Sequence, residues 1–102
     1  MLFRDESAMI ETHVSDLPFV ATASDGRILS YWHVTPRGDW CEDCRIGHEY
    51  ADLLVEFMRD GDRPFLLQRV MEDLVRSGKK SGVEVGFLHW MSVLAIRGSL
   101  AA

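Results

Sequence analysis

The sequence predicts an α+β fold in which one N-terminal β-hairpin is followed by three helices packed around it. Three observations favour it. Residues typical of β-strands flank an early Asp-Gly pair, and apolar residues then recur at helical spacings. Helix-capping and helix-breaking residues divide this later region into three helices. At 102 residues we expect a single small globular domain. Residues 1–16 are assigned to a flexible arm or short first element, residues 17–35 to the hairpin and residues 39–98 to the helical part.

The hairpin is predicted by Asp25-Gly26, which lies between residues 19–23 and residues 28–34. An Asp-Gly pair favours a type I′ turn, which needs positive φ at both central positions. Because side chains alternate along a strand, the second strand has two faces: Ile28, Ser30, Trp32 and Val34 on one, and Leu29, Tyr31 and His33 on the other. Neither face is plainly polar, so we expect both to be covered at least in part.

The first helix is expected to begin near Trp40, because Asp39 is a good N-cap. Arg59-Asp60-Gly61-Asp62 stops it, with Gly61 able to take the left-handed cap. On one face of this helix, Cys44, Gly47 and Ala51 recur at successive turns. Three small side chains in a row allow another backbone or an aromatic ring to approach closely.

The second helix is expected to follow Asp62 as its cap, with Pro64 near its first turn and Ser77-Gly78 at its end. Its core face is predicted to contain Phe65, Leu66, Val70 and Leu74, flanked by Leu67, Met71 and Val75.

The last segment begins ambiguously. Residues 83–87 alternate like a strand, and the two nearby glycines, Gly82 and Gly86, argue against an early helix. From Phe87 onward the apolar residues keep helical spacing, so we expect a helix over residues 83–97 with a weak start.

Charge and hydropathy exclude some functions. Acidic residues outnumber basic ones 16 to 11, which gives a formal net charge of −5. The compact basic group at residues 76–80 is too short to follow a phosphate backbone, so nucleic acid is not favoured as a partner. No window approaches the roughly 18 apolar residues of a membrane span, and charges interrupt the first six residues, where a signal peptide would begin its apolar segment. We therefore expect a cytoplasmic protein that does not enter a membrane.

Cys41 and Cys44 form a Cys-x-x-Cys pair that, with His48 and His33, offers the atoms of a zinc site. In one regular helix, however, Cys41 and His48 are separated by about 10 Å of rise. Ligands about 2.0 to 2.3 Å from one zinc ion need side chains that start much closer together. No metal site is therefore predicted.

A strand, then Trp40-Cys41-x-x-Cys44 and a long helix locally resemble the thioredoxin family over residues 28–58. The resemblance implies a thiol–disulfide oxidoreductase that uses Cys41 and Cys44, with the thiolate favoured by the helix N-terminus. The chain departs from the family because Glu42 and Asp43 replace the common Gly-Pro, and because the later strand pair and cis-proline are missing. The residues favour a second interpretation, in which Cys44 is a small side chain in a helix-packing groove.

The remaining polar candidates are weaker. Glu49, Asp52 and Glu56 recur at helical spacing, but a solvated helix face is favoured over a cation site, which needs ligands from more than one element. The four histidines, His13, His33, His48 and His89, are scattered without a catalytic constellation. We therefore predict no catalytic, cofactor-binding or metal-binding residue.

These observations favour a small non-enzymatic regulatory or adaptor protein that acts through protein–protein contacts. Two alternatives stay open: the oxidoreductase on Cys41 and Cys44, and an acidic inhibitor of a nucleic-acid-binding machine.

The last helix predicts a homodimer. One of its faces, with Phe87, Met91 and Leu94, can cover the core, which leaves Trp90, Val93 and Ile96 as interface candidates. A domain of this size buries only about two-thirds of the surface of its unfolded chain, so these side chains lack cover. A two-fold interface would let the same patch cover itself.

Overall fold

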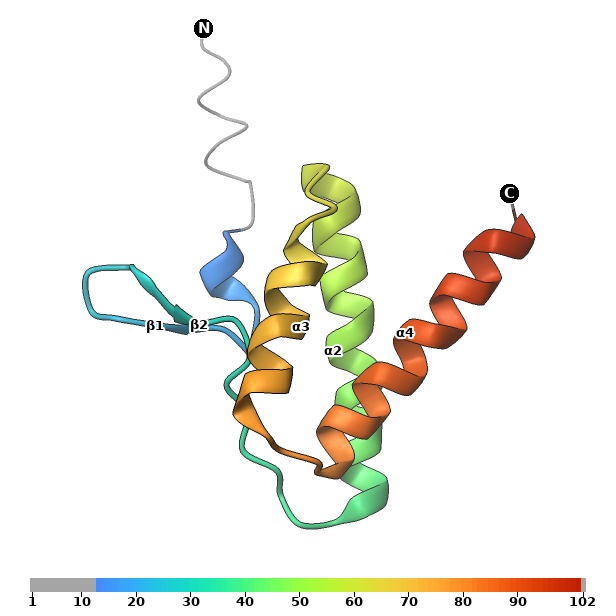
Figure 1. Cartoon of the computed structure of the whole chain (residues 1–102), viewed down its shortest axis with the longest axis horizontal. Coiled ribbons are helices and arrows are strands. Elements are labelled where there is room, and N and C mark those ends of the chain that lie inside the picture. Colours follow the sequence, from blue (N-terminus) through green and yellow to red (C-terminus); the bar gives the residue numbers. More distant parts are fainter. Residues whose placement is uncertain (1–12, 102) are drawn as a thin grey trace, which may run out of the picture.

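The computed structural model describes residues 13–101. The elements follow the order of a 3-10 turn η1 (Val14–Asp16), strands β1 (Ala21–Thr22) and β2 (Ile28–Ser30), and helices α2 (Trp40–Gly61), α3 (Leu66–Ser77) and α4 (Gly82–Ala101). An antiparallel hairpin followed by three helices confirms the predicted α+β fold (Figure 1). Of the predicted arm, residues 1–12 lie outside the described residues, and η1 falls in the remainder. Between residues 13 and 101, no helix is long and apolar enough to cross a membrane.

The hairpin is shorter than predicted and its turn is of another type. Gly26 has a φ of 92°, whereas Asp25 is not among the residues with positive φ, so the expected type I′ turn is wrong. The Gly26 N–H donates to the Ala23 carbonyl at 2.9 Å, and the Asp25 carboxylate accepts from the Arg27 N–H at 3.1 Å. These bonds close a turn in which glycine alone takes the left-handed conformation.

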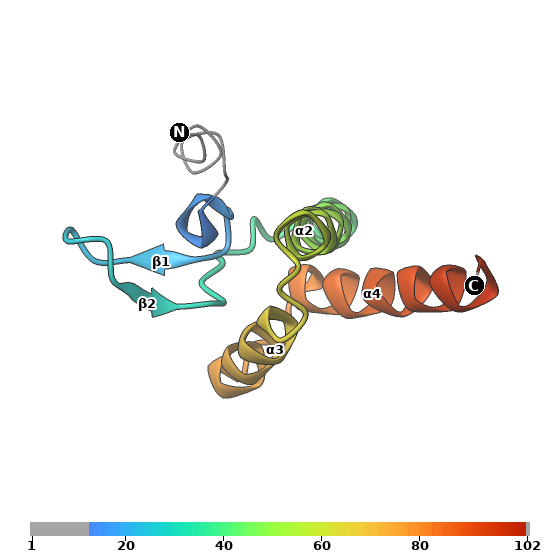
Figure 2. The same cartoon turned by 90° about the horizontal axis from the view of Figure 1, so that it is seen from above.

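One face of the hairpin is buried and the other is largely open. Trp32 and Val34 are buried, whereas Leu29 is 61% exposed and His33 is also exposed. On the same side as Leu29 and His33, Tyr31 is half-buried against the core, so the expectation that both faces are covered at least in part is met on the second face only at Tyr31. Figure 2 shows the reason: the helices lie to one side of the hairpin, and its tip points away from them.

Helix α2 begins as predicted and ends one residue later than expected. The Asp39 carboxylate accepts from the Glu42 N–H at 3.2 Å, which confirms the N-cap. At the other end Asp62, with a φ of 54°, takes the left-handed cap that we had assigned to Gly61. Asp62 is thereby used by α2, so its predicted role as the cap of the next helix is wrong.

Helix α3 starts at Leu66 and has no side-chain cap. Leu66, Val70 and Leu74 are buried as predicted, and Gly78 ends the helix with a φ of 69°. Phe65 and Val75 are each 72% exposed, so their assignment to the core face is wrong. Phe65 precedes the first helical turn, and Val75 lies about 100° around the helix from Leu74.

Aromatic rings in the core join the segments around the hairpin to α2 and α4, and α3 adds Leu66, Val70 and Leu74. The ring centroid of Trp32 lies 4.7 Å from that of Phe87 and 5.4 Å from that of Phe19. Two further bonds hold the hairpin and its following loop against α3 and the segment after it: the Tyr31 N–H donates to Asp73 at 2.7 Å, and the Lys79 ammonium donates to the Val34 carbonyl at 2.6 Å. The buried apolar residues are Leu17, Phe19, Trp32, Val34, Ala51, Leu54, Phe57, Leu66, Val70, Leu74, Val83 and Phe87.

Candidate interaction surface

The start of α4 is fixed by a buried carboxylate. Ser81 precedes the helix, and the Glu84 carboxylate accepts from both its N–H, at 2.9 Å, and its hydroxyl. The other oxygen of Glu84 accepts from the Trp32 indole N–H at 2.9 Å. Burial acts to raise the pKa of Glu84, but the bonds from Ser81 and Trp32 outweigh it and hold the pKa below its ordinary value. The Ser-x-x-Glu spacing of a capping box marks this helix start in the sequence, although the predicted helix was given a weak start.

Three glycines let α4 lie directly on α2. A Cβ on Gly86 would come within 2.3 Å of the Cys44 carbonyl oxygen, and one on Gly47 would come within 2.3 Å of the Val83 carbonyl oxygen. A Cβ on Gly82 would lie 2.8 Å from that of Asp43. The predicted close approach along the face of Cys44, Gly47 and Ala51 is confirmed. The same glycines that made the start of α4 ambiguous in the sequence are the residues on which it packs.

Trp90 continues this contact one turn further along α4. Its indole N–H donates to the Asp52 carboxylate at 2.8 Å, and its ring stacks on that of His48 with centroids 4.8 Å apart. The Arg97 guanidinium, two turns further along α4, lies 5.2 Å from the indole centroid. Trp90 is therefore half-buried and directed toward α2.

The opposite side of α4 carries an exposed apolar strip, which we call the outer face of α4. At about 100° per residue its members lie within roughly one third of the helix circumference. The outer face consists of Val85, Leu88, Ser92, Ala95 and Ile96, all exposed. Val85 is 42% exposed, Leu88 38% and Ile96 60%. Figure 2 shows α4 running outward from α2, on a different side from α3.

The three predicted interface candidates do not all lie on the outer face of α4. Ile96 lies on the outer face, Val93 is half-buried beside it, and Trp90 is engaged with α2. Phe87 is in the core, and Met91 and Leu94 pack against it, as predicted. Val85 and Leu88 were not among the predicted interface residues.

The cysteines occupy the first turns of α2. Cys41 is exposed and Cys44 is half-buried, and both are free thiols. The neighbouring carboxylates are engaged elsewhere: Glu42 pairs with Arg45, while buried Asp43 accepts from the backbone N–H groups of Arg37 and Gly38 at 2.9 and 3.1 Å. Asp43 thus fastens the loop before α2 to the helix.

The acidic side of α2 is solvated. Glu49, Asp52 and Glu56 are exposed, and Arg45 pairs with Glu49 as well as with Glu42. Among residues 13–101, no group of three or more histidine, cysteine, aspartate or glutamate side chains is placed to hold a metal ion. His48 and His89 lie near each other, with ring centroids 5.7 Å apart, but no third ligand joins them.

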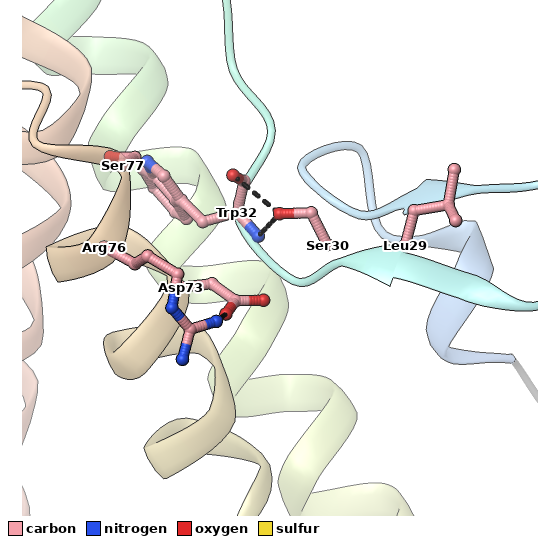
Figure 3. A pocket seen from close by; sticks show the side chains of 6 residues that line it. All are labelled: Leu29, Ser30, Trp32, Asp73, Arg76 and Ser77. Carbon is pink, nitrogen blue, oxygen red and sulfur yellow. Dashed lines mark hydrogen bonds and ion pairs between the residues drawn. The ribbon is translucent and has the colours of Figure 1, made fainter.

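A small pocket of about 270 Å³ lies between β2 and α3 (Figure 3). Leu29, Ser30 and Trp32 line one side, and Asp73, Arg76 and Ser77 line the other. Its polar groups already pair with one another or with the backbone: Asp73 binds the Tyr31 N–H and Arg76, and the Ser30 hydroxyl bonds to the Trp32 backbone. The bond from Tyr31 to Asp73 fastens the hairpin to α3, and the lining leaves few polar groups for a ligand.

Comparisons with protein-family models, with curated proteins and with solved structures found no match to this chain.

Proposed function

We propose that this protein is a small non-enzymatic regulatory or adaptor protein that acts through protein–protein contacts, and that the outer face of α4 is its contact surface. The observation that carries this proposal is the exposure of Val85, Leu88 and Ile96 on one side of one helix. Apolar side chains gathered on one exposed face favour association, because covering them removes apolar surface from water.

Charge supports the same surface. No aspartate or glutamate follows Glu84 in the sequence, although the chain as a whole has a net charge of −5. A contact at the outer face therefore avoids the desolvation of carboxylates, which is costly when they are not paired. The acidic side of α2 is less suited to the alternative role of an inhibitor of nucleic-acid-binding proteins, because Glu49 pairs with Arg45 and Asp52 accepts from the Trp90 indole.

Affinity capture from native extract, followed by mass spectrometry, tests the proposal. Leu88→Glu introduces a charge on the outer face, whereas Val75→Glu makes the same change at a more exposed apolar position on α3. We expect wild type and Val75→Glu to retain the same proteins and Leu88→Glu to lose them. The two variants must keep the circular dichroism of the wild type.

Two outcomes would count against the proposal. Capture of the same proteins by Leu88→Glu and wild type would show that the outer face is not the contact surface. Reduction of insulin by the protein with dithiothreitol as electron donor, abolished by Cys41→Ser, would favour the oxidoreductase instead.

A further inference from the structure

We propose that Cys41 and Cys44 form a modification site for peroxide, at which the two thiols are oxidised to an intramolecular disulfide. The site lies in the first turns of α2, on which the start of α4 packs. The modification is stoichiometric and reversible, which distinguishes it from the repeated thiol exchange of an oxidoreductase. It does not depend on the contact surface proposed for α4.

The two cysteines are placed to reach each other. They are three residues apart in α2, which begins at Trp40. Residues at this spacing are neighbours on the surface of a helix, with Cα atoms about 5 Å apart. A disulfide needs Cα atoms about 4.4 to 6.8 Å apart, so the helical backbone meets this requirement.

The different exposure of the two thiols assigns their roles. Cys41 is exposed and Cys44 is half-buried, so peroxide reaches Cys41 first. The Cys41 sulfur attacks one peroxide oxygen: an S–O bond forms, the O–O bond breaks and water leaves, which gives a sulfenic acid. The Cys44 sulfur then attacks the Cys41 sulfur, and an S–S bond replaces the S–O bond as a second water leaves. The dithiol loses two electrons and two protons, and the peroxide is reduced to two waters.

The carboxylates between the cysteines leave the two sulfur atoms free to meet. Glu42 pairs with Arg45, and Asp43 accepts from backbone N–H groups of the loop before α2. Each of the two carboxylate residues also lies about 100° or more around the helix from either cysteine. The disulfide therefore forms without displacing Glu42 or Asp43 from its partner.

The disulfide is expected to be easily reduced, because a regular helix holds the two Cβ atoms too far apart. Cβ atoms at this spacing lie about 5 to 6 Å apart, whereas those of a disulfide lie about 3.5 to 4.5 Å apart. The first turn of α2 must therefore tighten. The N–H groups of this turn have no acceptor within the helix, so the change breaks few helical bonds. Strained disulfides have the higher reduction potentials typical of regulatory ones.

Helix α4 responds to this change because its backbone packs directly on Cys44. A Cβ on Gly86 would lie 2.3 Å from the Cys44 carbonyl oxygen and 2.7 Å from the Cys44 Cα atom. A Cβ on Gly82 would lie 3.3 Å from the Cys44 nitrogen. With no side chain between the backbones at these glycines, a shift of Cys44 is transmitted to α4. Oxidation therefore loosens the start of α4.

Mass spectrometry after treatment with equimolar hydrogen peroxide tests the modification. Trypsin cleaves after Arg37 and Arg45 and releases residues 38–45, which contain both cysteines and no methionine. We expect this peptide to lose the mass of two hydrogen atoms and to regain it with glutathione. Cys41→Ser, which changes an exposed side chain, is the control and should lose no hydrogen. A peptide with only sulfenic or sulfinic acid at Cys41, or a covalent dimer through Cys41, would overturn the disulfide.

Amide hydrogen exchange tests the effect on α4. Residues 82–90 should exchange several-fold faster in the oxidised than in the reduced wild type, whereas residues 66–77 of α3 should not change. Peroxide should leave the exchange of Cys41→Ser unaltered. Equal exchange of residues 82–90 in both forms of the wild type would overturn the coupling to α4. Repeated reduction of insulin by the wild type with dithiothreitol would overturn the stoichiometric role and favour the oxidoreductase.

Discussion

At the scale of a single residue, Glu84 joins the start of α4 to the aromatic core. Its side chain is 2% exposed and accepts hydrogen bonds from Ser81 and Trp32. Glu84→Ala would leave the buried indole N–H of Trp32 without an acceptor, and an unsatisfied buried donor costs about 1 to 3 kcal/mol. We expect a loss of unfolding free energy of this order in urea denaturation at neutral pH. Glu84→Gln, which keeps one acceptor oxygen and nearly the same volume, is the matched control and should lose less.

The acid dependence of stability follows from the same residue. The pKa of Glu84 in the folded protein lies below its ordinary value, so the unfolded chain takes up a proton at higher pH than the folded protein. The stabilisation is fully present above about pH 4.3, the ordinary pKa of glutamate, and is lost as pH falls through the folded-state pKa. Between about pH 5 and about pH 3, the unfolding free energy of Glu84→Gln should therefore fall less steeply than that of the wild type. Parallel slopes for the two proteins would contradict this account.

At the scale of elements, the contact between α2 and α4 depends on glycines that have no room for a side chain. A Cβ at Gly86 would lie 2.3 Å from the backbone carbonyl oxygen of Cys44. We expect Gly86→Ala to lower the unfolding free energy by about 1 to 3 kcal/mol, the usual cost of overpacking. At Gly98 a Cβ meets nothing within 4 Å, so Gly98→Ala should instead raise it by roughly 0.5 kcal/mol through helix propensity. Urea denaturation followed by tryptophan fluorescence measures both changes in unfolding free energy. Changes of opposite sign for the two variants would support this account, and equal changes would refute it.

The ends of the elements show what can be predicted from this sequence. Asp39 and Gly78 were predictable because each satisfies a local requirement of the adjacent helix, an N-cap and a left-handed end. The role of Asp62 was not, because Gly61 beside it satisfies the same requirement with less strain. Phe65 was misassigned because apolar spacing alone does not show where the first turn of α3 begins.

The candidate surface was predictable only in part, for a related reason. The burial of Phe87 and the contact of Met91 and Leu94 with the core follow from helical spacing. The direction of the Trp90 side chain does not follow from helical spacing, because it depends on Asp52 and His48 of another helix. Gly82 and Gly86 were taken as weak helix formers, so the side of α4 that rests on α2 was missed, and with it the exposure of Val85 and Leu88 on the opposite side.

At the scale of the whole molecule, α2 connects the other parts. The hairpin packs through Phe19 against Tyr50 of α2, with ring centroids 5.3 Å apart, and α4 rests on the Gly47 side of the same helix. Figure 2 shows α3 and α4 leaving α2 in different directions. A partner of α4 can therefore approach its outer face without displacing the hairpin or α3.

The net charge of the protein predicts how salt acts on association through α4. Each copy has a net charge of −5, while the outer face of α4 contains no charged side chain. Added salt therefore weakens the general repulsion between copies without breaking ion pairs across the contact, and at about 1 M the screening length is only about 3 Å. For the homodimer that the sequence predicts, raising sodium chloride from about 10 mM to about 1 M should lower the dissociation constant measured by sedimentation. Leu88→Glu should stay monomeric across that range, because it would bury an unpaired carboxylate of each copy in the contact. A dissociation constant that rises with salt would mean that opposite charges meet across the interface, which the uncharged outer face does not provide.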